Sequence, residues 1–270
     1  MSILYIVPTP IGNLEDMTLR AIRILKEVHL ILAEDTRTSR VLLNHFEITT
    51  PMSSYHEHNK IGKIESILES LQMGDIALIS DAGTPGISDP GYELIQAAIA
   101  AGVTVVPLPG ANAVLPALVA SGLPTDRFTY LGFLPRKEKA LHDFLEQYSQ
   151  SPQTMIVYES PHRVLEALQA IERVFGQRQI CVAREISKMF EEFVRGDVSS
   201  VIQHFQDQNP RGEITIVIAG ASEDEKWTEA KLRQALAGRL SEGESLSYAS
   251  KALAKISGWQ KRDIYTLGNT

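Results

Sequence analysis

Residues 76–91, IALISDAGTPGISDPG, join a short apolar strand to a loop rich in glycine and proline. The loop, residues 80–91, holds three glycines, two prolines and the two aspartates Asp81 and Asp89, but neither lysine nor arginine. In α/β proteins, a loop directly after a buried strand is where a ligand approaches the backbone. A polyphosphate would favour a cation in such a loop. The stretch therefore predicts an α/β fold with a binding loop for a compact, positively charged ligand.

Apolar and amphipathic segments alternate along the first part of the chain. Short apolar runs, typical of buried strands, alternate with segments whose apolar residues recur at helical spacing. The expected strands are residues 3–7, 29–34, 75–80 and 103–110, and the expected helices are residues 17–28, 60–74, 91–102 and 111–122. This alternation predicts a parallel sheet covered by helices on both faces.

The alternation of strand and helix patterns is interrupted at residues 123–139, and we expect a domain boundary there. A second α/β unit follows, with strands over residues 154–160, 179–185 and 213–220 and a segment over 187–205 that begins as a strand or loop and ends as a helix. The last part divides into three short helices. The predicted domains are residues 1–122, 123–225 and a small helix-turn-helix-like tail over 226–270.

Composition and charge restrict the class of protein. The chain has 270 residues, 44% hydrophobic and 22% charged, which is typical of a soluble globular protein. A single cysteine, Cys181, excludes an intrachain disulfide framework. With neither an apolar run of membrane-spanning length nor a secretory signal, we expect a cytoplasmic protein that does not bind membranes. The net charge is −7, but the tail from Thr228 onward holds 7 basic and 4 acidic residues, a net of +3.

Three loops that follow expected strands carry the binding signal: residues 8–13, 80–91 and 107–113. None matches the glycine patterns that hold the phosphates of dinucleotides or ATP. S-adenosylmethionine, which carries a sulfonium and an ammonium, suits these loops better. The alternative for any one loop is that its glycines and prolines only form tight turns.

Eight motifs occur together and in a fixed order. They are PTPIGNLEDMT from residue 8, AEDTR (33–37), SYHEHN (54–59), SDAGTPGISDPG (80–91), PLPGANA (107–113), GFLPRK (132–137), YESPHR (158–163) and REISK (184–188). Along nearly its full length the chain resembles the bacterial 2′-O-ribose methyltransferases that act on cytidine in small-subunit ribosomal RNA. That family belongs to the tetrapyrrole methylase superfamily of class III methyltransferases.

The resemblance implies a two-domain tetrapyrrole-methylase-like α/β fold with a small helical C-terminal extension. It implies S-adenosylmethionine in the cleft between the two domains, a homodimer, and cytidine 1402 of 16S ribosomal RNA in the small ribosomal subunit as the target. The cofactor-binding residues that it implies are Pro10, Asp81, Gly83, Thr84, Ile87, Ser88, Gly110, Ala111, Asn112, Ala113, Tyr158 and Glu159.

Methyl transfer to a ribose hydroxyl requires a group that accepts the hydroxyl proton. Glu159 and Lys188 are the candidates that we favour, beside Glu34 and Asp35. Lys188 could act as a base only if burial or a neighbouring cation lowers its pKa; otherwise it would orient the alkoxide or stabilise it. For each carboxylate, an ion pair with a nearby arginine is an equally good explanation.

Candidate RNA contacts are cations and polar side chains near the expected cleft. They are Arg37, His56, His58, Arg136, Lys137, His162 and Arg163. A surface charge in solvent is the alternative for each. His56 and His58 lie two positions apart, without the spacing of a zinc-binding helix, so we expect a polar loop and no metal site.

Three other functions remain open. A methylase of the same fold could act on a corrin, a porphyrin or another small molecule, and activity on ribosomal particles separates it from the favoured function. A non-catalytic RNA-binding assembly factor would fail to bind S-adenosylmethionine. An ordinary Rossmann nucleotide enzyme lacks its fingerprint here.

Overall fold

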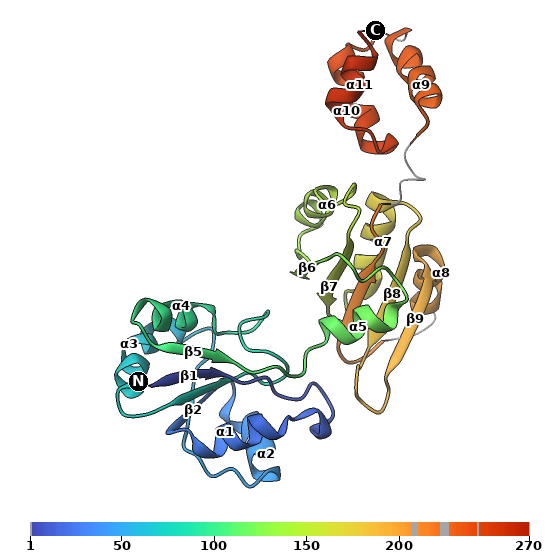
Figure 1. The fold of residues 1–270 in the computed structure, drawn as a ribbon. Coiled ribbons are helices and arrows are strands. Elements are labelled where there is room, and N and C mark those ends of the chain that lie inside the picture. The colour runs from blue at the N-terminus through green and yellow to red at the C-terminus, as the bar shows by residue number, and fades with distance from the viewer. Residues whose placement is uncertain (1, 207–209, 222–226, 242, 270) are drawn as a thin grey trace.

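The computed structural model describes residues 2–206, 210–221, 227–241 and 243–269. Within these residues the chain forms two five-stranded sheets, followed by a separate unit of three helices (Figure 1). None of the described helices is long and apolar enough to cross a membrane.

The first sheet is entirely parallel and has the strand order β3-β2-β4-β1-β5. Its strands are β1 (Ile3–Ile6), β2 (Leu30–Ala33), β3 (Met52–Ser54), β4 (Ile76–Ile79) and β5 (Thr104–Pro107). All four residues of β4 are buried, because the central strand is covered on both faces. The parallel sheet predicted from the sequence is therefore confirmed.

Helices cover both faces of the first sheet. One face packs on α1 (Leu19–Glu27) and α2 (Thr36–His45), and the other packs on α3 (Lys60–Leu71) and α4 (Tyr92–Ala100). A short 3-10 helix, Leu14–Asp16, precedes α1. Because every strand runs the same way, the loops after β1, β2, β4 and β5 meet at one edge of the sheet.

The second sheet is mixed and has the order β6-β7-β10-β8-β9. Its strands are β6 (Phe128–Phe133), β7 (Thr154–Glu159), β8 (Gln179–Arg184), β9 (Glu192–Asp197) and β10 (Ile214–Ile218). One face packs on α6 (Glu138–Glu146), α7 (Val164–Phe175) and α8 (Val198–Gln206). The central strand β10 is antiparallel to both β7 and β8, which brings its first residues beside the carboxyl ends of those strands.

The other face of the second sheet is covered by α5 (Val114–Ser121), whose Val114, Ala117 and Leu118 pack against Ile156 and Val217. This helix precedes the boundary that we placed at residue 122, yet its apolar side packs on the later sheet. The segment 123–139, treated as a boundary, contains the edge strand β6 and the start of α6. The domain limits stay a prediction, and the limit at 225/226 lies outside the described residues.

The tail forms three helices, as the sequence predicted: α9 (Glu229–Ser241), α10 (Leu246–Ser257) and α11 (Lys261–Leu267). Their buried side chains form a small core of their own, which consists of Leu232, Leu236, Ala249, Leu253 and Ile264. Figure 1 shows this unit apart from both sheets.

Candidate functional site

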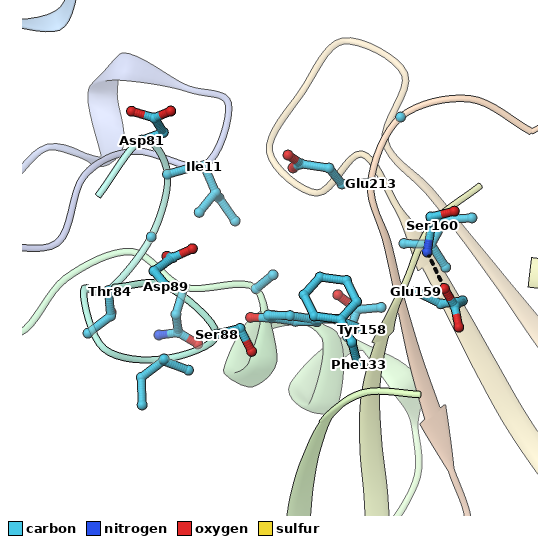
Figure 2. A pocket seen from close by; sticks show the side chains of 18 of the residues that line it. Ile11, Asp81, Thr84, Ser88, Asp89, Phe133, Tyr158, Glu159, Ser160 and Glu213 are labelled. Carbon is cyan, nitrogen blue, oxygen red and sulfur yellow. Dashed lines mark hydrogen bonds between the residues drawn. The ribbon is translucent and has the colours of Figure 1, made fainter. Parts of the chain in front are cut away.

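A cavity of about 420 Å³ lies where the loops of the first sheet face the second sheet (Figure 2). The first sheet contributes the loop after β4, together with Ile11 after β1, Glu34 after β2 and Ala113 after β5. The second sheet contributes the end of β7 and the start of β10. The volume is in the range of small-molecule and cofactor sites.

The loop after β4 is held by hydrogen bonds to neighbouring loops. Thr9 and Gly83 exchange two backbone hydrogen bonds of 2.9 Å, and the Thr84 hydroxyl donates to the Ala111 carbonyl at 3.2 Å. The Asp81 carboxylate accepts a hydrogen bond from the Asp35 backbone N–H at 3.1 Å. Gly83 has a φ of 82°, which favours glycine. These hydrogen bonds link the loops after β1, β2, β4 and β5 to one another.

The cavity is acidic. Among the described residues, no lysine, arginine or histidine lines it, whereas five carboxylate residues do: Glu34, Asp81, Asp89, Glu159 and Glu213. In Figure 2, Asp81 and Asp89 lie on one side and Glu213 faces them from the other sheet. Such a cavity attracts a cation and repels a polyphosphate.

Burial and neighbouring negative charges raise the pKa values of two of these carboxylates. Partial burial, followed by the negative charge of Glu34, raises the pKa of Asp89 to about 7, although a hydrogen bond with Ser80 opposes the shift. Burial and the charge of Asp81 also raise the pKa of Glu34. Asp89 is therefore divided between its neutral and charged forms at neutral pH.

Aromatic side chains form the wall on the second sheet. Tyr158 packs edge-on against Tyr130 and Phe133, with ring centroids 5.1 and 5.7 Å away. The Tyr130 hydroxyl lies 2.6 Å from the Ser88 hydroxyl and so links β6 to the loop after β4. Ser88 has a φ of 63°, an uncommon conformation outside glycine that is found at ligand sites. The wall offers the apolar surface that an adenosine ring requires.

Nine of the cofactor-binding residues predicted from the sequence line this cavity: Asp81, Gly83, Thr84, Ile87, Ser88, Asn112, Ala113, Tyr158 and Glu159. The other three, Pro10, Gly110 and Ala111, lie in the adjoining loops. Ala111 accepts the hydrogen bond from Thr84, and a Cβ on Gly110 would lie 2.6 Å from the Cβ of Pro8. The structure thus brings the predicted set together, while the binding role of each residue stays a prediction.

Glu159 is 3% exposed, and its carboxylate is turned toward α7. One oxygen accepts a hydrogen bond from the Ser160 backbone N–H at 2.7 Å, and the Arg163 guanidinium lies 3.3 Å from the other. Burial raises the pKa of Glu159, while both of these partners oppose the shift. In Figure 2 the carboxylate lies beside Ser160, on the side away from Asp81 and Asp89. This geometry favours the ion pair that the sequence left as the alternative to a base.

Lys188 lies at the edge of the cavity and does not line it. Its Nζ lies 2.8 Å from Glu185 and 3.1 Å from Glu213. Burial lowers the pKa of Lys188, but the hydrogen bonds to these two carboxylates outweigh that effect and leave the pKa raised. The lowered pKa that a lysine base requires is therefore absent, and Lys188 carries its charge at neutral pH.

Of the predicted RNA contacts, some are exposed and others bind neighbouring groups of the protein. Arg136, Lys137, His58 and His162 are exposed. The other three are engaged: the Arg37 guanidinium pairs with Asp35, the His56 ring lies 3.1 Å from the Asn59 amide, and Arg163 donates to the carbonyls of Leu134 and Pro135. Arg163 thus fixes the segment that precedes Arg136.

Glu213, Tyr130 and Phe133 are site residues that the sequence did not indicate. Glu213 reaches the cavity because β10 enters between β7 and β8, a pairing that local sequence does not encode. Tyr130 and Phe133 lie on β6, inside the segment that we treated as a boundary. Among the described residues, no group of three or more histidine, cysteine or acidic side chains is arranged to hold a metal ion.

Comparison with known proteins gives consistent matches. The family model of the Tetrapyrrole (Corrin/Porphyrin) Methylases matches residues 3–202. Ribosomal RNA small subunit methyltransferase I of Synechocystis sp. is 47% identical, with 99% of this chain and 97% of the relative covered. The protein of that name from Bacillus subtilis is 46% identical, with 98% and 93% covered.

Among solved structures, the uroporphyrin-III C-methyl transferase of Thermus thermophilus, complexed with S-adenyl homocysteine, matches with a TM-score of 0.56 and 21% identity. The match covers 80% of this chain and 97% of that one. At this level of identity the likeness shows a shared fold.

Proposed function

The chain belongs to the tetrapyrrole methylase family, and from this membership we propose that it transfers a methyl group from S-adenosylmethionine to ribosomal RNA of the small subunit. Relatives that are 46% and 47% identical to this chain are named as methyltransferases of small-subunit ribosomal RNA. The motif set further supports the ribose 2′-hydroxyl of cytidine 1402 in 16S RNA as the acceptor. The small-molecule methylases of this fold are far less similar in sequence.

The observation that carries the proposal is the charge of the cavity. Glu34, Asp81, Asp89 and Glu213 line it without a lysine, arginine or histidine from the described residues, and this fits a ligand with a sulfonium and an ammonium. The aromatic wall of Tyr158 and Phe133 fits the adenosine. S-adenosylmethionine supplies an activated methyl group, so the protein must position the acceptor and remove one proton.

We assign the removal of the acceptor's hydroxyl proton to a carboxylate of the cavity. Asp89 lines the cavity on the loop after β4, forms no ion pair with another described residue, and is charged once the cationic donor is bound, so its carboxylate is free to accept the proton. Glu159 is held by Arg163, and Lys188 is held in its charged form. In this scheme Lys188 positions Glu213 at the edge of the cavity.

The RNA would approach along the exposed cations Arg136 and Lys137 at the start of α6, with His162 nearby on the loop before α7. Phosphate contacts of this kind position a nucleic acid without specifying its sequence. The homodimer and the cytoplasmic location also stay proposals, the second supported by a ribosomal substrate.

The decisive experiment maps ribose methylation by mass spectrometry. In 16S RNA from a strain that lacks this protein, we expect cytidine 1402 to lose its ribose methyl group and to regain it when the purified protein and S-adenosylmethionine are added to small ribosomal subunits. An unchanged methylation pattern in the deletion strain would refute the target. Calorimetry with S-adenosylmethionine distinguishes a wrong target from an inactive binding protein.

A further inference from the structure

Two adjacent large apolar side chains stand in solvent at the turn between β8 and β9. Met189 is 89% exposed and Phe190 is 68% exposed. Large apolar side chains that are exposed side by side near a site indicate a contact surface.

The turn that carries them is rigidly built. Glu185 and Ser187 both have positive φ values, 53° and 64°. The Ser187 backbone N–H donates to the Glu191 carboxylate at 2.7 Å, and the Lys188 N–H donates to the Glu185 carbonyl at 3.0 Å. Strained conformations of this kind persist when surrounding contacts hold them, and they concentrate at functional sites.

Contacts on both sides place this turn at the mouth of the cavity. Lys188 binds Glu213, which lines the cavity from the second sheet. The stem of Lys188 also packs over Gly12, where a Cβ would lie 2.2 Å from Lys188 Cγ, and the neighbouring Ile11 lines the cavity from the first sheet. Figure 2 shows Glu213 and Ile11 facing one another across this opening. Phe190 follows Lys188 by two residues on the same turn and is exposed.

We propose that Phe190, with Met189 beside it, is the stacking surface for the target nucleobase. The inference rests on the proposed function, because an enzyme that methylates one ribose must fix that nucleotide in position relative to the methyl donor. Unstacked RNA bases are held by aromatic side chains, and a phenylalanine stacks without favouring a base edge. A phosphate does not suit the turn, since its one cation, Lys188, is paired with Glu185 and Glu213.

The test compares Phe190→Ala, Phe190→Leu and Phe190→Tyr with Ile61→Ala as the control. Ile61 is 75% exposed on α3, which packs on the first sheet. Ile61→Ala therefore removes a similar exposed apolar side chain far along the chain from Phe190. The measurements are KM and kcat for small ribosomal subunits with labelled S-adenosylmethionine, calorimetry with S-adenosylmethionine alone, and mass in solution by light scattering.

We expect Phe190→Ala and Phe190→Leu to raise KM for the ribosomal substrate about tenfold. Phe190→Tyr should restore it, because a ring stacks and a branched alkyl chain does not. Affinity for S-adenosylmethionine and mass in solution should equal those of the wild type, as should every property of Ile61→Ala.

Two outcomes would overturn the inference. In one, KM is unchanged in Phe190→Ala. In the other, Phe190→Ala changes the mass in solution and Phe190→Leu restores it, which would assign the side chain to contact between copies of the chain. A wild-type protein that binds S-adenosylmethionine but methylates no ribosomal RNA would instead refute the proposed function, and the inference with it.

Discussion

Asp89 shows how single residues set the chemistry of the cavity. Its carboxylate is partly buried beside Glu34, Asp81 and Glu213, and burial first, then these negative charges, raise its pKa to about 7. A bound cation stabilises the charged form and lowers that pKa again. Binding of the methyl donor is therefore coupled to release of a proton.

This coupling predicts a pH-dependent affinity. The wild-type protein should bind S-adenosylmethionine more tightly above pH 7 and lose affinity as the pH falls through 7, by at most tenfold per pH unit, because Asp89 must give up its proton. Asp89→Asn should bind more weakly at pH 8 and lack this dependence. Calorimetry of both proteins between pH 6 and 8 measures the difference, and titration of the donor itself cancels in the comparison.

Thermal unfolding supplies the control. The raised pKa means that the folded state disfavours the charged carboxylate, so Asp89→Asn should unfold at a higher temperature than the wild type above pH 7 and no lower below it. Equal pH dependence of donor affinity in both proteins would show that Asp89 does not face the donor.

At the scale of the elements, the site depends on how closely the loops after β1 and β5 approach each other. Gly110 lies against the ring of Pro8, and a Cβ there would come within 2.6 Å of Pro8 Cβ and 2.9 Å of Pro8 Cγ. A proline ring cannot rotate aside. The close packing of the two loops therefore requires a glycine at residue 110, so this glycine does more than form a tight turn.

Gly110→Ala should separate these loops, lower the melting temperature by several degrees and weaken S-adenosylmethionine binding about tenfold. Gly62→Ala is the matched control. It lies inside α3 with no atom within 4 Å of the new Cβ, so it should stabilise the protein by about 0.5–1 kcal/mol and leave donor affinity unchanged. Differential scanning calorimetry and donor titration test both, and normal donor affinity in Gly110→Ala would contradict the packing argument.

At the scale of the whole molecule, acidic and basic residues are concentrated in different parts of the chain. Residues 1–122 hold 7 basic and 13 acidic residues, a net of −6, and include most of the acidic cavity. Arg136, Lys137 and Lys139 are exposed on the segment that follows Phe133, which lines the cavity, and none of the three forms an ion pair with another described residue. The net charge of −7 thus conceals a local basic surface suited to a polyanion.

Replacing Arg136, Lys137 and Lys139 together with glutamine should weaken binding to 16S RNA and reduce the slope of log affinity against log salt by about 2. Affinity for S-adenosylmethionine should not change. Arg20→Gln with Lys26→Gln, two exposed cations on α1, is the control and should leave the slope unchanged. Filter binding between 50 and 200 mM salt measures the slopes, and an equal loss of RNA and donor affinity would contradict the assignment.

The sequence by itself determined the parallel first sheet, the binding loops at its edge and their suitability for a cation, because strand periodicity, turn residues and the absence of basic side chains are local properties. Only the tertiary structure decided that Glu213 faces Asp81 and Asp89, that β6 supplies part of the aromatic wall, and that Arg163 holds Glu159. These facts follow from the antiparallel insertion of β10 and from contacts between segments far apart in the chain. Such contacts depend on the summed burial of both sheets, which no short stretch of residues contains.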